Sequence, residues 1–127
     1  MRSTIAALLT ALTLAMEVQA NEPDTAMASK STYLVLYRPG PAWPAGAPVS
    51  ALPLRDHASY MLSLYKQGAL KMAGPLTDNA GGAVVLEVQS ETVAREIVLE
   101  DPAVKAGLFV YELHPWAPVN WEHRLNP

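Results

Sequence analysis

Cysteine is absent from this chain of 127 residues, and its absence excludes several kinds of protein. A small domain without cysteine has no disulfide cross-links, no thiol nucleophile and no residue that carries the lipid of a lipoprotein. Its stability must come from a hydrophobic core. The composition suits such a core, because 50% of the residues are hydrophobic and only 17% are charged. The length is enough for one compact domain.

Basic residues are also few, nine in all, and they stand singly along the chain. The formal net charge is −3 at pH 7. A nucleic acid is bound by a cluster or stripe of lysine and arginine, so no nucleic acid is expected as a partner. Glycine-rich phosphate loops, dinucleotide-binding fingerprints and closely spaced metal ligands are missing too. We therefore expect no cofactor and no metal site.

Long hydrophobic runs are missing as well, apart from a short one near the start. The apolar run from Ile5 to Met16 falls below the roughly 20 residues that span a bilayer. Arg2 before this run and the small residues up to Ala20 after it are typical of a secretory signal peptide. We expect residues 1–20 to be cleaved, the mature protein to be exported to the periplasm or secreted, and no stable membrane anchor to remain. Residues 21–31 are polar and aperiodic, which predicts a flexible leader.

The rest of the chain alternates between patterns typical of strands and of helices. The expected elements are strands at 32–37, 69–73, 83–88 and 108–113, a helix at 54–67, and a helix that runs from a Ser90 cap to Asp101-Pro102. This β-α-β-β-α-β order is that of ferredoxin-like α+β folds, in which a four-stranded antiparallel sheet carries both helices on one face. The domain is expected to span residues 32–116, with a C-terminal tail at 117–127.

Proline is concentrated between the first expected strand and the first expected helix, where five of the eleven prolines lie between Pro39 and Pro53. Proline restricts the backbone and cannot donate a backbone hydrogen bond. This segment therefore predicts a stiff, irregular loop that arches over a neighbouring surface, and loops of this length often serve function.

The expected arrangement leaves one face of the sheet without a covering layer. An apolar sheet face needs a partner layer, and the same face of a second subunit is the simplest one. We therefore predict a homodimer that forms through the open sheet face.

Several short motifs together resemble one family. In chain order they are His57, Gly74-Pro75-Leu76 with Asp78, Gly81-Gly82, Asp101-Pro102 and Pro115-Trp116. The chain resembles the YCII-related (YciI-like) domain from about Tyr33 to Trp116. The resemblance implies a dimeric α/β-barrel fold and a site built around a histidine and an aspartate. The expected leader, the additional prolines and the tail depart from the plain family pattern.

His57 is the first candidate catalytic residue. Helical spacing predicts an inward stripe of Leu54, Ala58, Met61 and Tyr65, and His57 falls on that stripe. An inward imidazole suits a general base or acid, because it exchanges protons near neutral pH. The spacing alone favours a core histidine that hydrogen-bonds a backbone carbonyl, and it is the family resemblance that favours the catalytic interpretation.

Asp101 and Asp78 are the two candidate partners of His57. Asp101 precedes a proline, where it suits both the cap of a turn and a site carboxylate. Asp78 lies among turn residues, where an aspartate commonly closes a turn through its own side chain. The sequence does not choose between them.

Three further residues are candidates for substrate binding. Arg38 ends the first expected strand, where it is either a solvated surface charge or the holder of an anionic or phenolate substrate. Pro75 and Trp116 belong to the motifs that carry the family resemblance.

Two functions remain open from the sequence. In the first, the protein is a small exported enzyme whose His57, oriented by Asp101 or Asp78, moves a proton on a cyclic or phenolic small molecule in a lyase or isomerase type of step. In the alternative, it is a non-catalytic homodimer that binds a small-molecule ligand or acts as an accessory protein.

Overall fold

The computed structural model describes residues 29–127. The predicted signal peptide, residues 1–20, lies outside the described residues, as do residues 21–28 of the predicted leader. Among the described residues, no helix has both the length and the apolar character needed to cross a membrane.

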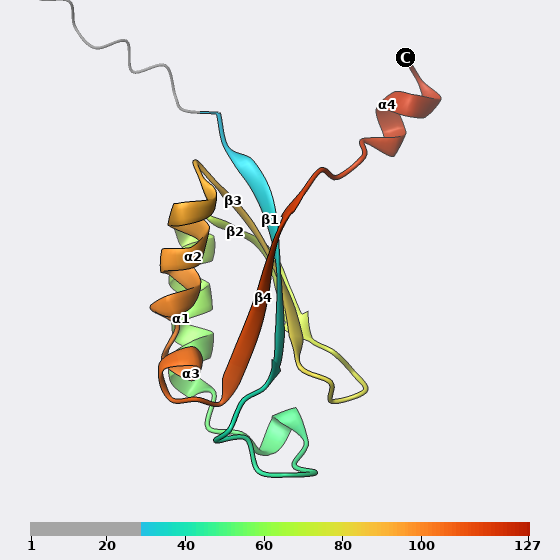
Figure 1. The fold of residues 1–127 in the computed structure, drawn as a ribbon. Coiled ribbons are helices and arrows are strands. Elements are labelled where there is room, and N and C mark those ends of the chain that lie inside the picture. Colours follow the sequence, from blue (N-terminus) through green and yellow to red (C-terminus); the bar gives the residue numbers. More distant parts are fainter. Residues whose placement is uncertain (1–28) are drawn as a thin grey trace, which may run out of the picture.

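Four strands form one antiparallel sheet in the order β2-β3-β1-β4, and helices cover one of its faces (Figure 1). The elements, in chain order, are β1 (Ser31–Pro39), the 3₁₀ helix η1 (Val49–Ala51), α1 (Arg55–Lys66), β2 (Leu70–Pro75), β3 (Gly82–Val88), α2 (Glu91–Leu99), α3 (Pro102–Lys105), β4 (Phe109–Trp116) and α4 (Trp121–Leu125). The predicted ferredoxin-like α+β fold is confirmed, and the short helices η1, α3 and α4 are additional to the two predicted ones.

The core lies between the sheet and the helices. On β1, every second side chain from Tyr33 to Tyr37 is buried, and β3 shows the same alternation from Val84 to Val88. The strand register places Val35 beside Val84, so both strands turn their apolar side chains to the same face. Burying each such side chain contributes about 1.5–3 kcal/mol. This layer supports the site, because Tyr37 at its end also reaches the functional residues described below.

The inward stripe of α1 differs from the predicted one. Met61 and Leu64 are the buried residues of this helix, whereas the predicted Tyr65 is 61% exposed. Consecutive residues of a helix are rotated by about 100° around its axis. Leu64 therefore faces the core, and the next residue, Tyr65, points away from it. His57 lies one turn before Met61 and does face inward.

Several elements extend beyond their predicted bounds. β2 continues to Pro75, which is tolerated because β2 is an edge strand where a proline need not donate to a neighbour. β4 runs on to Trp116. The predicted tail contains α4, which Asn120 caps by accepting a hydrogen bond from the His123 backbone N–H at 3.0 Å. In Figure 1, α4 projects away from the sheet.

The proline-rich loop packs against the end of the core. Trp43 is buried, and its Nε1–H donates to the Ala47 carbonyl at 2.9 Å. Gly40 donates its N–H to the Leu108 carbonyl at 2.8 Å, and a Cβ at Gly40 would lie only 2.3 Å from the Gly107 carbonyl oxygen. Only glycine allows this close approach. It fixes the loop beside the start of β4 and so positions η1 near the mouth of a cavity.

The other face of the sheet has no covering layer in the described chain (Figure 1). We call it the open face; its side chains come from alternate positions of the four strands, among them Leu34, Leu36, Arg38, Met72, Val85, Val110, Glu112 and Trp116. Met72 is 67% exposed and Val110 46%. Arg38 pairs with Glu112 across the face at 3.0 Å.

Candidate active site

His57 projects from the first turn of α1, and its partner comes from the turn between α2 and α3. Nδ1 of His57 lies 2.8 Å from Oδ2 and 2.9 Å from Oδ1 of Asp101. The His57 side chain is 17% exposed, whereas the Asp101 side chain is fully buried. The structure therefore brings His57 together with one of its two candidate aspartates.

Local sequence explains why Asp101 stands at this point. It is the N-cap of α3, and its Oδ1 accepts a hydrogen bond from the Ala103 backbone N–H at 2.9 Å. Pro102 follows at the first helical position, where its missing N–H costs nothing. The cap fixes the carboxylate at the end of α3 that faces His57. Asp101 is thus both a helix cap and a partner of the histidine.

A third side chain completes the surroundings of this carboxylate. The Tyr37 hydroxyl donates a hydrogen bond to Asp101 Oδ2 at 2.9 Å. A buried carboxylate is costly unless donors replace its lost water, and here Tyr37, His57 and the Ala103 N–H supply them. Burial and the negative charge of Asp101 both raise the pKa of Tyr37, so its hydroxyl remains a donor throughout the neutral range.

These contacts assign the two ring nitrogens of His57. An ionised carboxylate only accepts hydrogen bonds, so Nδ1 is the donor toward Asp101, and in the neutral form of the imidazole the lone pair belongs to Nε2. Nε2 has no hydrogen-bond partner among residues 29–127. No buried polar side-chain atom in that range lacks a partner, so Nε2 must be in contact with solvent.

The ring of His57 is also held by two aromatic neighbours. Its centroid lies 5.9 Å from that of Tyr37 and 5.3 Å from that of Phe109, in both cases with nearly perpendicular ring planes. Edge-to-face contacts of this kind are favourable and limit the rotation of the imidazole.

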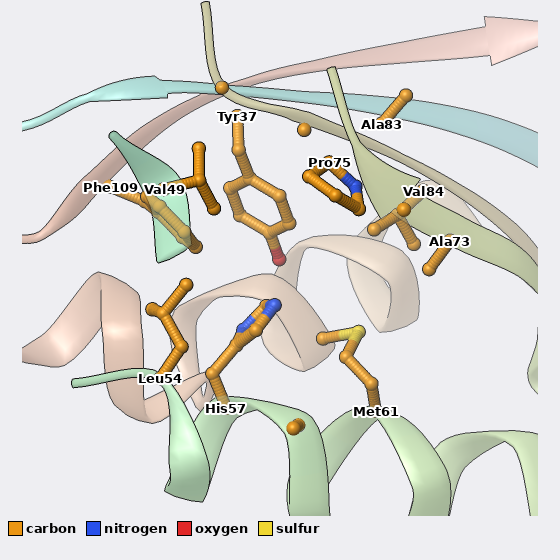
Figure 2. A pocket seen from close by; sticks show the side chains of 14 residues that line it. Tyr37, Val49, Leu54, His57, Met61, Ala73, Pro75, Ala83, Val84 and Phe109 are labelled. Carbon is orange, nitrogen blue, oxygen red and sulfur yellow. The ribbon is translucent and has the colours of Figure 1, made fainter. Parts of the chain in front are cut away.

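His57 opens onto a cavity of about 360 Å³ between α1 and the sheet (Figure 2). The residues that line it are mostly apolar or glycine: Tyr37, Val49, Leu54, His57, Ala58, Met61, Ala73, Gly74, Pro75, Gly81, Gly82, Ala83, Val84 and Phe109. Gly81 has φ +137°, and a Cβ there would lie 1.8 Å from the Tyr37 carbonyl oxygen. The loop before β3 can approach β1 this closely only because residue 81 is glycine.

The other predicted site residues are placed differently. Pro75 lines the cavity. Asp78 does not, and its Oδ1 accepts the Ala80 backbone N–H at 3.1 Å within the loop between β2 and β3. Arg38 pairs with Glu112 on the open face, and Trp116, 46% exposed, lies at the far end of β4. The structure therefore does not bring Asp78, Arg38 or Trp116 to His57.

The hydrogen bond from Tyr37 to Asp101 was missed at the level of sequence. In the sequence, Tyr37 is only the last residue of the first expected strand. The alternation of β1 does point Tyr37 inward, and a buried tyrosine hydroxyl requires a partner. Its partner lies 64 residues away in the chain, however, and no local pattern identifies it.

Metal ligands do not gather at this site. Among residues 29–127, no group of three or more histidine, aspartate or glutamate side chains is arranged to hold a metal ion.

Comparisons with known proteins place the chain in a family. Residues 31–117 match the model of the YCII-related domain, so the chain belongs to the YCII-related family. The uncharacterized protein YjpA of Bacillus subtilis is 37% identical over 60 residues, which cover 47% of this chain and 71% of YjpA.

A solved structure supports the same fold. The 5-chloro-2-hydroxyhydroquinone dehydrochlorinase of Burkholderia phenoliruptrix, determined in complex with 2,5-dihydroxybenzoquinone, aligns with a TM-score of 0.51 at 22% identity. The alignment covers 71% of this chain and 97% of the dehydrochlorinase. At this identity the likeness shows a shared fold alone.

Proposed function

We propose that this protein is a small-molecule enzyme in which His57 transfers protons on a cyclic, hydroxylated substrate, in a lyase or isomerase type of reaction. One observation carries the proposal: Nδ1 of His57 is fixed by the buried Asp101 while Nε2 stands free beside an apolar cavity. An imidazole held in this way accepts and returns protons near neutral pH. The activity in the name of the similar dehydrochlorinase fits such chemistry.

The proposed step needs only a proton acceptor and a group that stabilises this acceptor once it is protonated. Nε2 removes a proton from a ring hydroxyl or an activated C–H group, and the electron pair moves into the ring. The step ends either when His57 returns the proton at another ring atom or when a leaving group departs with an electron pair. Asp101 stabilises the imidazolium that exists in between, because its carboxylate is already hydrogen-bonded to Nδ1.

The cavity favours an uncharged substrate. Apart from His57, no residue that lines it has an ionic side chain. Arg38, the cation that we considered for an anionic substrate, is paired with Glu112 on the open face. A ligand carboxylate would therefore lose water without gaining a fixed positive partner. A substituted ring would instead contact Phe109, Met61 and Val84.

The test is a turnover and binding screen with the full chain. Hydroquinones, hydroxyhydroquinones, their chlorinated forms and the corresponding quinones are followed by ultraviolet absorbance, and their affinity is measured by calorimetry. His57→Gln should lower turnover about 10²- to 10⁴-fold while the dissociation constant changes only a few-fold. His114→Gln is the matched control, because His114 lies on β4 with a side chain that is 56% exposed.

The alternative function, a non-catalytic binding or accessory protein, is supported by the same cavity. It would be favoured if compounds of this panel bind the unmutated protein and none is converted. Equal losses of affinity and turnover in His57→Gln would likewise contradict a proton-transfer role, because they would make His57 a binding residue.

We further propose that the protein forms a homodimer through the open face. Met72 and Val110 are exposed there, and no element of the described chain covers them (Figure 1). Val110→Asp should shift the sedimentation of the protein from dimer to monomer. Leu62→Asp, on the helical side and 53% exposed, should leave it dimeric. A monomeric unmutated protein at micromolar concentration would contradict the proposal.

We also propose that the protein is exported. The proposal rests on Arg2, the apolar run from Ile5 to Met16 and the small residues up to Ala20. The protein recovered from the periplasm or the medium of its own cells should begin near Asn21. Recovery of an intact chain beginning at Met1, confined to the cytosol, would contradict export.

A further inference from the structure

Tyr37 and His57 both contact the same carboxylate oxygen of Asp101. Its hydroxyl donates to Oδ2 of Asp101 at 2.9 Å, and Nδ1 of His57 lies 2.8 Å from the same oxygen. The tyrosine is only 2% exposed, so no water competes freely for this hydrogen bond. The hydroxyl and the imidazole therefore draw on the same negative charge.

The effect of this sharing on proton binding has a definite sign. Each hydrogen bond donated to an ionised carboxylate stabilises the charged form and weakens its attraction for another proton. The Tyr37 hydroxyl therefore disfavours a proton on Asp101 and also weakens the pull of Asp101 on the imidazolium form of His57. The two residues are coupled, so the relevant quantity is proton uptake by the pair.

The hydroxyl is suited to this role because it does not lose its own proton at neutral pH. Burial, followed by the negative charge of Asp101, raises the pKa of Tyr37. Three other titratable groups belong to the electrostatic surroundings: Tyr60 from α1 and Tyr111 from β4 act on Tyr37, and Glu100, just after α2, acts on Tyr60. None of the three hydrogen-bonds Asp101. The Tyr60 hydroxyl, for example, donates to the Ile97 carbonyl at 2.8 Å.

We propose that Tyr37 is a positioning residue of this site: by hydrogen-bonding Asp101 it keeps the proton on Nδ1 of His57 and weakens proton binding by the His57–Asp101 pair, so that Nε2 is a free base near neutral pH. The role rests on the proposed function of His57, but its test does not need a substrate. Tyr37 acts through Asp101 and is not itself the group that transfers the proton.

The test is an NMR titration of the histidine nitrogens in the full chain. With ¹⁵N-labelled histidine, the His57 resonances are assigned by comparison with His57→Gln. Tyr37→Phe should raise the midpoint of proton uptake by on the order of one pH unit. Tyr60→Phe, which removes a different partly buried hydroxyl, should leave the midpoint unchanged. An unchanged or lowered midpoint in folded Tyr37→Phe would overturn the proposal.

A second measurement covers the case in which Tyr37→Phe does not fold. In the Tyr60→Phe protein, the remaining tyrosines are replaced biosynthetically by 3-fluorotyrosine, whose hydroxyl is a stronger donor. The His57 midpoint should then fall by a few tenths of a pH unit. A rise or no change would overturn the role of the hydroxyl.

Turnover separates this inference from the proposed function. If a substrate is found, the acidic limb of the pH profile of kcat/KM should move to higher pH in Tyr37→Phe by the same amount as the titration midpoint. If the titration moves as expected while no compound is ever converted, the positioning role stands and the proposed enzymatic function fails.

Discussion

Two turns of this molecule make the same local hydrogen bond with opposite consequences. In the loop between β2 and β3, Oδ1 of Asp78 accepts the N–H of Ala80 at 3.1 Å. In the turn between α2 and α3, Oδ1 of Asp101 accepts the N–H of Ala103 at 2.9 Å. Both aspartates thus close a turn with the backbone two residues further on.

The difference between the two turns lies in what surrounds them. Asp78 belongs to a loop whose residues from Leu76 to Ala80 are all exposed, whereas Asp101 is fully buried. Asp101 also meets His57 and Tyr37, which are 44 and 64 residues away in the chain. A capping interaction therefore fixes where a carboxylate stands, but long-range packing decides whether it becomes part of a site.

The sharpest test of this comparison is the removal of the buried carboxylate. Asp101→Ala leaves the Ala103 N–H, the Tyr37 hydroxyl and Nδ1 of His57 without their acceptor. The free energy of unfolding should fall by about 2–4 kcal/mol, and any turnover should be lost because His57 is no longer oriented. Urea denaturation and the turnover assay measure the two effects. A loss of stability below about 1 kcal/mol would mean that water replaces the carboxylate, and that its burial matters little.

A smaller expected effect at the Asp101 turn is the dependence of protein stability on alkaline pH. The pKa of Tyr37 is raised in the folded protein, so the unfolded chain loses this proton first, from about pH 10 upward. The contribution of Tyr37 to stability is therefore complete below about pH 10 and declines above it, by up to about 1.4 kcal/mol per pH unit. In Tyr37→Phe the alkaline loss of stability should be less steep.

Chemical denaturation between pH 8 and pH 11 measures this slope. Tyr65→Phe is the matched control, because Tyr65 is 61% exposed and makes no contact with Asp101 in the hydrogen-bond network. Equal slopes in Tyr37→Phe and the unmutated protein would show that the tyrosine next to Asp101 titrates like an exposed one.

The fold was accessible from the sequence because its determinants are local. Alternation from Tyr33 to Tyr37, the Ser90 cap and the proline after Asp101 each depend on neighbouring residues, and together they gave the order of the main elements. The prediction of which side of α1 faces the core was wrong at one end, because Leu64 rather than Tyr65 is buried. A difference of one position separates these two residues, which is within the tolerance of a helical pattern.

The site was accessible only in part, for the same physical reason. The sequence indicated His57 and two aspartates, but it could not choose between Asp78 and Asp101, since both stand where an aspartate closes a turn. The choice depends on burial and on the packing of α1 against α3. The contribution of Tyr37 depends on strand register and on the position of α3, which no spacing along the chain encodes.

The smallest expected effect belongs to the exposed aspartate and completes the comparison. Asp78→Ala removes one solvent-exposed hydrogen bond, and the loop keeps a second anchor, because Asn79 Oδ1 accepts the Val49 N–H at 3.3 Å. The free energy of unfolding should fall by about 0.5 kcal/mol, with turnover and ligand affinity unchanged. Measured beside Asp101→Ala, this variant removes the same local hydrogen bond without the buried contacts. A loss of turnover comparable to that of Asp101→Ala would mean that the β2–β3 loop moves Asp78 onto the ligand when the cavity is occupied, and that the difference between the two turns holds only for the empty site.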